Sequence, residues 1–327
     1  MTSQRHRFFR FLFIPLLILA VLLGLVLFRQ HAGLPTRFST QSNTPWNLIL
    51  VNNEHALPRG YSPELTTLSN GVQVDSRIYP DLQSMFDDMR TEGVYPVVGE
   101  GYRSEQQQQE MMQEKIDAYL AEGYSERKAR KEAEKWVAKP NYSEHQLGLA
   151  LDINADKSRC DNDTIYQWLS QNAYRYGFIL RYPDDKTSIT GVDYMPHHFR
   201  YVGLPHSLIM YENNYCLEEY LDYLKSYTID QPLTYTTDDA SYEIYYYAAN
   251  SNGETEVKIP KKDSYSISGN NTDGFIITVQ KSAGEISGET ATDAATQDDN
   301  ADAATGDTTT SNDSEAATTE AAAANEE

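Results

Sequence analysis

Two short stretches of the chain hold side chains of the kinds that bind zinc. The first runs Ser143-Glu-His-Gln-Leu-Gly-Leu-Ala-Leu-Asp152-Ile153 and contains His145 and Asp152. From Gly148 onward, apolar residues alternate with small ones, which predicts a strand with one buried face and with Asp152 on the opposite face. His145 directly precedes this strand and can turn toward the same place. An imidazole nitrogen and a carboxylate oxygen are both zinc ligands.

The second stretch is Gly191-Val-Asp-Tyr-Met-Pro-His-His198-Phe-Arg-Tyr-Val-Gly203, which holds two adjacent histidines of the seven in the chain. Its aromatic residues favour a strand. One ligand from here would complete three protein ligands with an open fourth position, as catalytic zinc requires. Taken singly, these residues have ordinary explanations, because an isolated histidine is more often structural and Asp152 alone could cap a turn.

The elements that must position these residues belong to a body of mixed helical and strand patterns at residues 46–231. Strands are predicted at 47–51 and 94–98, and a capping box of Ser104 and Gln107 opens a helix that runs to Leu120. Further helices are predicted at 125–137, 164–176 (ending at Gly177) and 217–227. A small β-rich module follows at 232–281, with strands expected at 242–247, 256–259 and 274–280.

The N-terminus predicts a membrane anchor. Arg5, Arg7 and Arg10 precede an uncharged apolar run at 11–28, and Arg29 follows it. Eighteen residues lie near the lower limit for crossing a bilayer, and the end of the run has no small-residue cleavage pattern. We expect a single-pass anchor in the cell membrane with a cytoplasmic N-terminus (1–10) and an extracellular body. A cleaved signal peptide is the alternative. Residues 29–45 are predicted to be a linker.

Charge and cysteine content exclude some classes of protein. The net charge of −21 argues against a nucleic-acid partner, which would require a basic face. An acidic Ala/Thr-rich tail at 282–327 carries much of this charge and contains almost no large apolar residues, so we expect it to be disordered. Cys160 and Cys216 could form a disulfide outside the cell or remain unpaired. We expect a monomer.

The combination of motifs resembles the VanY-like D-alanyl-D-alanine carboxypeptidases, which are zinc enzymes of the hedgehog/D,D-peptidase fold. The matching residues appear in the family's order over about 101–203. They are Gly101-Tyr-Arg103-Ser104 with Gln108, then Ser143, His145, Gly148, Ala150 and Asp152, then Arg181-Tyr-Pro183, Lys186, Thr190-Gly191, and Pro196-His-His198-Phe-Arg200-Tyr-Val-Gly203. The resemblance implies an α+β fold in which an antiparallel sheet is flanked by helices.

The resemblance also implies roles for particular residues. His145, Asp152 and His198 would bind Zn²⁺, and Arg103 would stabilise the scissile carbonyl as it gains negative charge. Gln108 and Ser143 would help to bind the substrate. The implied reaction removes the C-terminal D-alanine from peptidoglycan stem peptides.

One position departs from the family pattern. The family has a glutamate three residues before its last histidine ligand, where it acts as the general base, and this chain has Met195 there. The family's tryptophan is replaced by His197. Two nearby residues, Asp193 and His197, are candidate substitutes for the base. Alternatively, Asp193 is a carboxylate in a turn that faces solvent, and His197 is a side chain in the wall of the pocket.

Three hypotheses follow for the function. The first is a D,D-carboxypeptidase of pentapeptide stems, and the second is an L,D-carboxypeptidase of tetrapeptide stems that uses the same metal site. The third is a peptidoglycan-binding homologue without catalysis, which would explain Met195.

Overall fold

The computed structural model describes residues 36–41, 45–251 and 253–281. The expected anchor at 11–28, the basic residues before it and the acidic tail from 282 lie outside these ranges. Within the described ranges, no helix is both long and apolar enough to cross a bilayer. The anchor and the tail therefore stay predictions.

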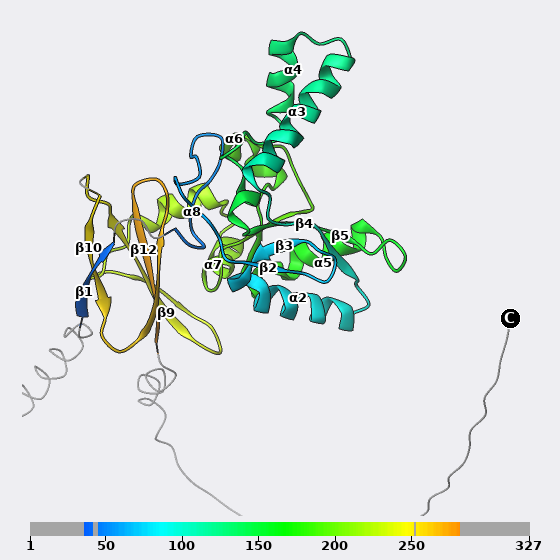
Figure 1. The fold of residues 1–327 in the computed structure, drawn as a ribbon. Coiled ribbons are helices and arrows are strands. Elements are labelled where there is room, and N and C mark those ends of the chain that lie inside the picture. The colour runs from blue at the N-terminus through cyan, green and yellow to red at the C-terminus, as the bar shows by residue number, and fades with distance from the viewer. Residues whose placement is uncertain (1–35, 42–44, 252, 282–327) are drawn as a thin grey trace, which may run out of the picture. The chain divides into compact units, whose positions relative to one another are not determined.

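A four-stranded antiparallel sheet forms the centre of the body (Figure 1). Its strands lie in the order β4 (Pro96–Glu100), β5 (Ala150–Ala155), β7 (His198–Tyr201) and β6 (Phe178–Leu180). The predicted strand of alternating small and apolar residues is β5, and it lies between β4 and β7. The α+β fold class expected from the sequence is therefore observed.

Two helices cover one face of this sheet. Leu151 and Ile153 of β5 are fully buried and share a core with α2 (Tyr79–Thr91) and α5 (Asn162–Asn172). Asp152 has the opposite orientation, because side chains alternate along a strand. The predicted separation of an apolar face from a carboxylate-bearing face is thereby confirmed.

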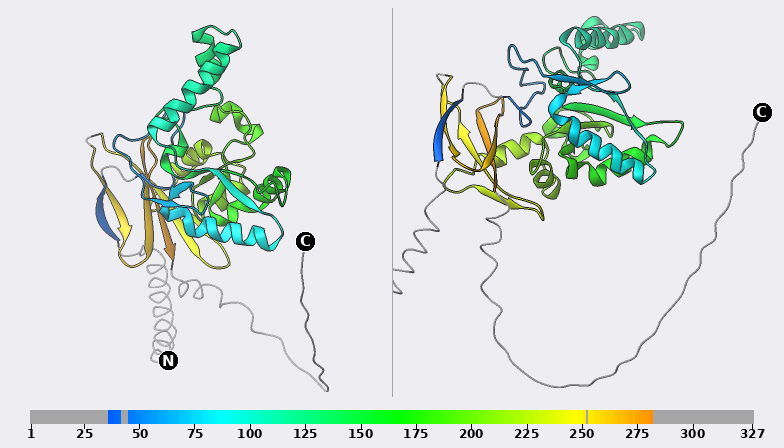
Figure 2. Two further views of the ribbon diagram at one scale, coloured as in Figure 1. Left: turned by 45° about the vertical axis from the view of Figure 1, so that its right-hand side comes forward. Right: turned by 60° about the horizontal axis from the view of Figure 1, so that its bottom comes forward.

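The other helical elements connect the strands or extend from them. The predicted capping box is present, since Ser104 Oγ accepts the Gln107 N–H at 3.2 Å while Gln107 Oε1 accepts the Ser104 N–H. In the views of Figures 1 and 2, α3 and α4 project from the body. The helical elements are η1 (Ser76–Ile78), α3 (Glu105–Ala121), α4 (Glu126–Ala133), η2 (Glu144–Leu147), η3 (Ala173–Tyr176), η4 (Asp184–Lys186), α6 (Thr187–Thr190), α7 (His206–Glu212) and α8 (Leu217–Leu224).

The predicted β-rich module contains a second antiparallel sheet in the order β11-β12-β9-β8. A separate two-stranded sheet pairs β1 with β10, and another pairs β2 with β3. The strands are β1 (Thr36–Gln41), β2 (Leu65–Thr67), β3 (Gln73–Asp75), β8 (Leu233–Thr236), β9 (Ser241–Ala248), β10 (Thr255–Pro260), β11 (Ser264–Gly269) and β12 (Gly274–Lys281).

Two segments differ from the sequence predictions. Residues 36–41, expected to belong to an irregular linker, form β1 and pair with β10 more than 200 residues later. Residues 47–51, expected to form a strand, are buried but irregular. Arg200 donates to the carbonyl oxygens of Asn47 and Ile49. The Leu50 N–H donates to the carbonyl oxygen of Asn270, just after β11, so this backbone is satisfied without a strand ladder of its own.

The two cysteines are free, with Cys160 half-buried and Cys216 buried. The structure therefore contains no Cys160–Cys216 disulfide, and the unpaired alternative holds. Cys160 contacts the backbone of Tyr95, whereas Cys216 is the N-cap residue of α8.

His206 connects the body to the β-rich module. One ring nitrogen lies 2.8 Å from the Tyr220 hydroxyl of α8, and the other lies 2.9 Å from Thr278 Oγ1 of β12. The ring is buried, and this burial lowers the pKa of His206 to about 3. Because the unfolded chain takes up a proton on this ring near pH 6.5 and the folded chain does not, acid favours unfolding.

We predict that His206 makes the free energy of unfolding fall as the pH drops from 7 toward 5. Its contribution to this loss is about 2 kcal/mol, because protonation of the unfolded state is not matched in the folded state. Urea denaturation of the metal-free wild type and of His206→Gln at both pH values measures the difference. Equal losses in the two proteins would contradict the assignment.

Candidate metal centre and active-site cleft

His145, Asp152 and His198 come together into one cluster. Their potential ligand atoms all lie within 4.8 Å of one another. His198 Nδ1 lies 2.9 Å from Asp152 Oδ1, and His145 Nε2 lies 3.6 Å from the same oxygen. Both histidines are buried, whereas Asp152 is partly exposed. The three ligands implied by the sequence therefore share one site.

Strand pairing and one tight turn bring these residues together. Asp152 of β5 lies directly opposite His198 of β7 in the antiparallel register. His145 comes from η2, which ends at Gly148 with a φ of +72°. A side chain at Gly148 would place a Cβ only 2.9 Å from the Asp75 backbone nitrogen. Only glycine fits both this left-handed conformation and this close contact, so Gly148 sets the step from the turn into β5.

The electrostatics of the cluster suit a dication. Burial lowers the pKa of His145 to about 4, so its ring is neutral near pH 7. Its Nδ1 lies 2.8 Å from the Gly101 carbonyl oxygen, which can only accept a hydrogen bond, so Nε2 is left free. Burial alone would raise the pKa of Asp152, but the hydrogen bond from His198 holds it below its usual range. Two imidazoles and a carboxylate with an open side form a donor set that fits Zn²⁺.

The cluster lies in a cleft of about 300 Å³. Its walls come from the end of β4, the segment after α4, the η2 turn and the segment before β7. The lining residues are Asn53, Glu100, Arg103, Met111, Glu134, Lys135, Trp136, Val137, Ala138, Tyr142, Ser143, Glu144, His145, Asp152, Tyr182, Val192, Tyr194, Met195, His197 and His198. A peptide bound here would reach the three candidate ligands and Arg103 together.

Arg103 is held rigidly at the edge of this cleft. Its guanidinium forms an ion pair with Glu100 at 2.6 Å and donates to Gln108 Oε1 at 2.6 Å. Gln108 is fully buried, and its amide nitrogen donates to the Ala138 carbonyl oxygen. Gln108 therefore lies behind Arg103 and not among the cleft-lining residues, so the structure places it to orient the arginine. A direct contact between Gln108 and substrate stays a prediction.

The other expected site residues separate into two groups. Ser143 and His197 line the cleft, as does Met195, the residue at the position of the family's glutamate. Asp193 is exposed and is not among the cleft-lining residues. Its place two residues before Met195 does not bring it to the same wall, because residues 193–195 are irregular and 196–197 form a turn, in place of an extended strand.

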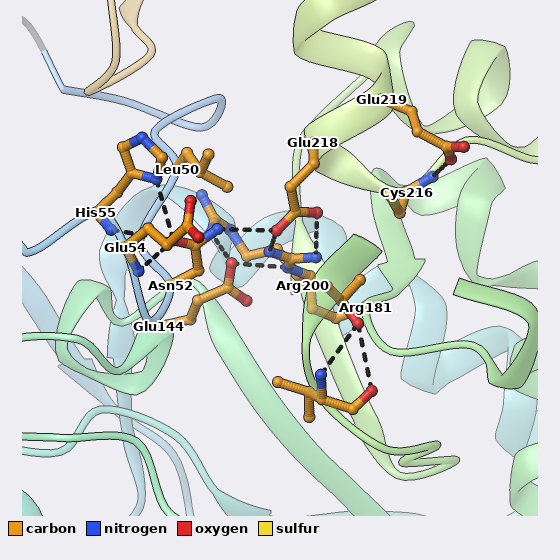
Figure 3. A network of polar contacts seen from close by, with 12 residues as sticks. Leu50, Asn52, Glu54, His55, Glu144, Arg181, Arg200, Cys216, Glu218 and Glu219 are labelled. Carbon is orange, nitrogen blue, oxygen red and sulfur yellow. Dashed lines mark hydrogen bonds and ion pairs between the residues drawn. The ribbon is translucent and has the colours of Figure 1, made fainter. Parts of the chain in front are cut away.

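Sequence reasoning missed Glu144, a buried residue of the cleft lining that lies beside the ligand His198. Its Oε1 accepts from Arg181 Nε and from Arg200 Nη1, each at 2.8 Å (Figure 3). Glutamates are rarely buried without partners, and nothing local in the sequence marks this one as buried. The partners lie 37 and 56 residues away, so the pairing became visible only in the fold.

Comparison with known proteins agrees with the family resemblance found in the sequence motifs. Residues 71–204 match the family model described as VanY, D-alanyl-D-alanine carboxypeptidase. A D-alanyl-D-alanine carboxypeptidase of Enterococcus faecalis (strain ATCC 700802 / V583) is 53% identical over 54% of this chain and 66% of its own length, just under two thirds. One from Enterococcus faecium is 36% identical over 71% of this chain and 75% of its own. The chain belongs to the VanY family.

Solved structures agree with this family assignment. A variant of the vancomycin resistance D,D-pentapeptidase VanY, crystallised with Zn(II), is 53% identical, with a TM-score of 0.53 over 54% of this chain and 99% of that one. The D,D-dipeptidase VanXYg, bound to a phosphinate analogue of D-Ala-D-Ala, is 33% identical, with a TM-score of 0.66 over 76% of this chain and 100% of that one. The zinc expected from the sequence is thus present in a close relative of this VanY-family chain.

We predict that Asp152→Ala abolishes zinc binding, because it removes the carboxylate ligand. Zinc at about 100 times its dissociation constant should raise the free energy of unfolding of the wild type by about 2.7 kcal/mol. The variant should gain almost nothing. Urea denaturation with and without zinc measures both values.

The matched control is His55→Gln, which removes a histidine outside the cluster. It should keep the full stabilisation by zinc. An equal zinc response in Asp152→Ala and the wild type would place the metal elsewhere.

Proposed function

We propose that this protein is a zinc-dependent carboxypeptidase that removes the C-terminal D-alanine from peptidoglycan stem peptides. The observation that carries the proposal is the cluster of His145, Asp152 and His198 in a cleft whose lining also includes Arg103. Membership of the VanY family supplies the substrate class, and the relatives are named for this reaction.

Different residues of the chain would have different roles in peptide hydrolysis. His145, Asp152 and His198 would hold a zinc ion, which when bound lowers the pKa of a water molecule and polarises the scissile carbonyl. Arg103 is fixed by Glu100 and Gln108, so it can donate to the carbonyl oxygen as negative charge develops there. A donor that is already in place needs no reorganisation during the reaction, which is why such groups accelerate it strongly.

The proton transfers need a group other than Met195, since a thioether cannot act as a base. We assign this role to His197. It lines the cleft next to the ligand His198, and an imidazole has ring nitrogens that can accept and donate a proton. Asp193 is the weaker choice because it is exposed and is not part of the cleft lining.

The proposed location is the outer face of the cell membrane, where peptidoglycan is found. It rests on the apolar run at 11–28 and the arginines that precede it. The run would hold the enzyme at the surface, and a monomer is sufficient because the described residues of one chain supply the whole metal cluster.

Met195 favours a second candidate, a homologue that binds stem peptides without cleaving them.

We predict that the zinc-loaded full-length protein in detergent releases D-alanine from a synthetic stem pentapeptide, as measured by mass spectrometry. Arg103→Ala should lower kcat by roughly 10²–10³-fold, the range for loss of an oxyanion donor. Saturable binding without release in the wild type would favour the second candidate. Release from a tetrapeptide only would favour the L,D-carboxypeptidase.

We predict that His197→Ala lowers kcat by roughly 10²–10⁴-fold, the usual contribution of general acid–base catalysis. Asp193→Asn should leave kcat within about twofold, as expected for a residue outside the cleft. Steady-state kinetics on the pentapeptide, with zinc content checked in parallel, make the comparison. A small effect of His197→Ala with a large effect of Asp193→Asn would reverse the assignment.

A further inference from the structure

Two buried polar atoms face one another next to the metal cluster. Glu144 Oε2 and His198 Nε2 lie 3.7 Å apart, and neither has a hydrogen-bond partner within the described part of the chain. An unpaired buried polar group is costly, so two such atoms in contact range require an explanation. The opposite ring nitrogen, His198 Nδ1, faces Asp152.

The orientation of Glu144 is fixed from behind. Its other oxygen, Oε1, accepts one hydrogen bond from Arg181 and one from Arg200 (Figure 3). Both guanidinium groups are fully buried. Burial alone would raise the pKa of Glu144, but the charges of Arg181 and Arg200 hold it well below its usual range. The carboxylate therefore presents Oε2 to His198 and cannot turn away without breaking the hydrogen bonds from both arginines.

The two arginines are in turn anchored by segments outside residues 71–204, the region that the family model matches. Arg181 donates two hydrogen bonds to Glu218 of α8, at 2.9 and 2.7 Å. Arg200 donates to two carbonyl oxygens of the irregular segment 47–51.

We propose that Glu144 is the positioning residue of the metal ligand His198. Its carboxylate would accept a hydrogen bond from the Nε2–H group of His198, which leaves Nδ1 as the metal-binding atom. A neutral imidazole carries its proton on one nitrogen only, and the hydrogen bond made by that nitrogen decides which one it is. Carboxylates placed behind histidine ligands act in this way in metal sites. The proposal depends on the metal site of the proposed function but not on any cleavage activity.

The decisive variant is Glu144→Gln. The two arginines only donate hydrogen bonds, so the amide oxygen must take the Oε1 position. The amide NH₂ then faces His198 Nε2 and favours that atom as an acceptor, which moves the ring proton to Nδ1, where it competes with the metal. We expect the dissociation constant for zinc to rise about 10–100-fold, the usual effect of losing such a partner.

The matched control is Glu218→Gln, which disturbs Arg181, one of the two arginines behind Glu144, without touching His198. Zinc affinity, measured by competition with a chromophoric chelator, should change less than about threefold in this variant. Far-UV circular dichroism and the metal-free melting temperature check that both variants fold. Wild-type affinity in a folded Glu144→Gln, or equal losses in both variants, would overturn the proposal.

A measurement on the wild-type protein keeps the test valid if Glu144→Gln does not fold. Long-range ¹H–¹⁵N spectra of the histidine rings in the zinc-loaded full chain report which nitrogen carries the proton. We expect His198 to show a protonated Nε2 and a metal-bound Nδ1. A metal-bound or unprotonated Nε2 would overturn the proposal. These readouts do not involve peptide cleavage, so a failure here is distinguishable from a failure of the proposed activity.

Discussion

Glu144 carries its charge where water does not reach, and the arginines on either side make this possible. Removing a charged group from water has a desolvation cost of several kcal/mol, and here it applies to two guanidinium groups and one carboxylate. The cost is offset only because Glu144, Arg181 and Arg200 meet in good geometry and their remaining donors reach Glu218 and backbone carbonyl oxygens. Removing one partner from such a group usually costs roughly 3–5 kcal/mol, since it leaves an uncompensated buried charge.

This buried network and the metal cluster are parts of one arrangement. Glu144 and His145 are neighbours in the η2 turn, and His198 and Arg200 lie on the same face of β7, two residues apart. The η2 turn and β7 therefore each supply one ligand and one of the charges behind the ligands. Helix α8 and the segment 47–51 close the network from the far side. These two segments lie outside the region matched by the family model, and they help to hold the site in place.

The sequence predicted local features well. The capping box at Ser104 is local, and so is the alternation in β5, and both were found as expected. The three ligands could be identified because their spacing matched a family. Residues 36–41 and 47–51 were predicted wrongly, since their partners are more than 150 residues away and a pattern within a few residues does not record them. Glu144 was missed for the same reason.

Met195 leaves this chain without the glutamate base of its family. The proposed reaction and the proposed role of Glu144 both depend on the metal centre. The most direct test is a crystal structure with zinc, using anomalous scattering at the zinc edge. We predict a single zinc peak in contact with His145 Nε2, Asp152 Oδ1 and His198 Nδ1. A peak bound through His198 Nε2, or a zinc site away from these three residues, would contradict the account.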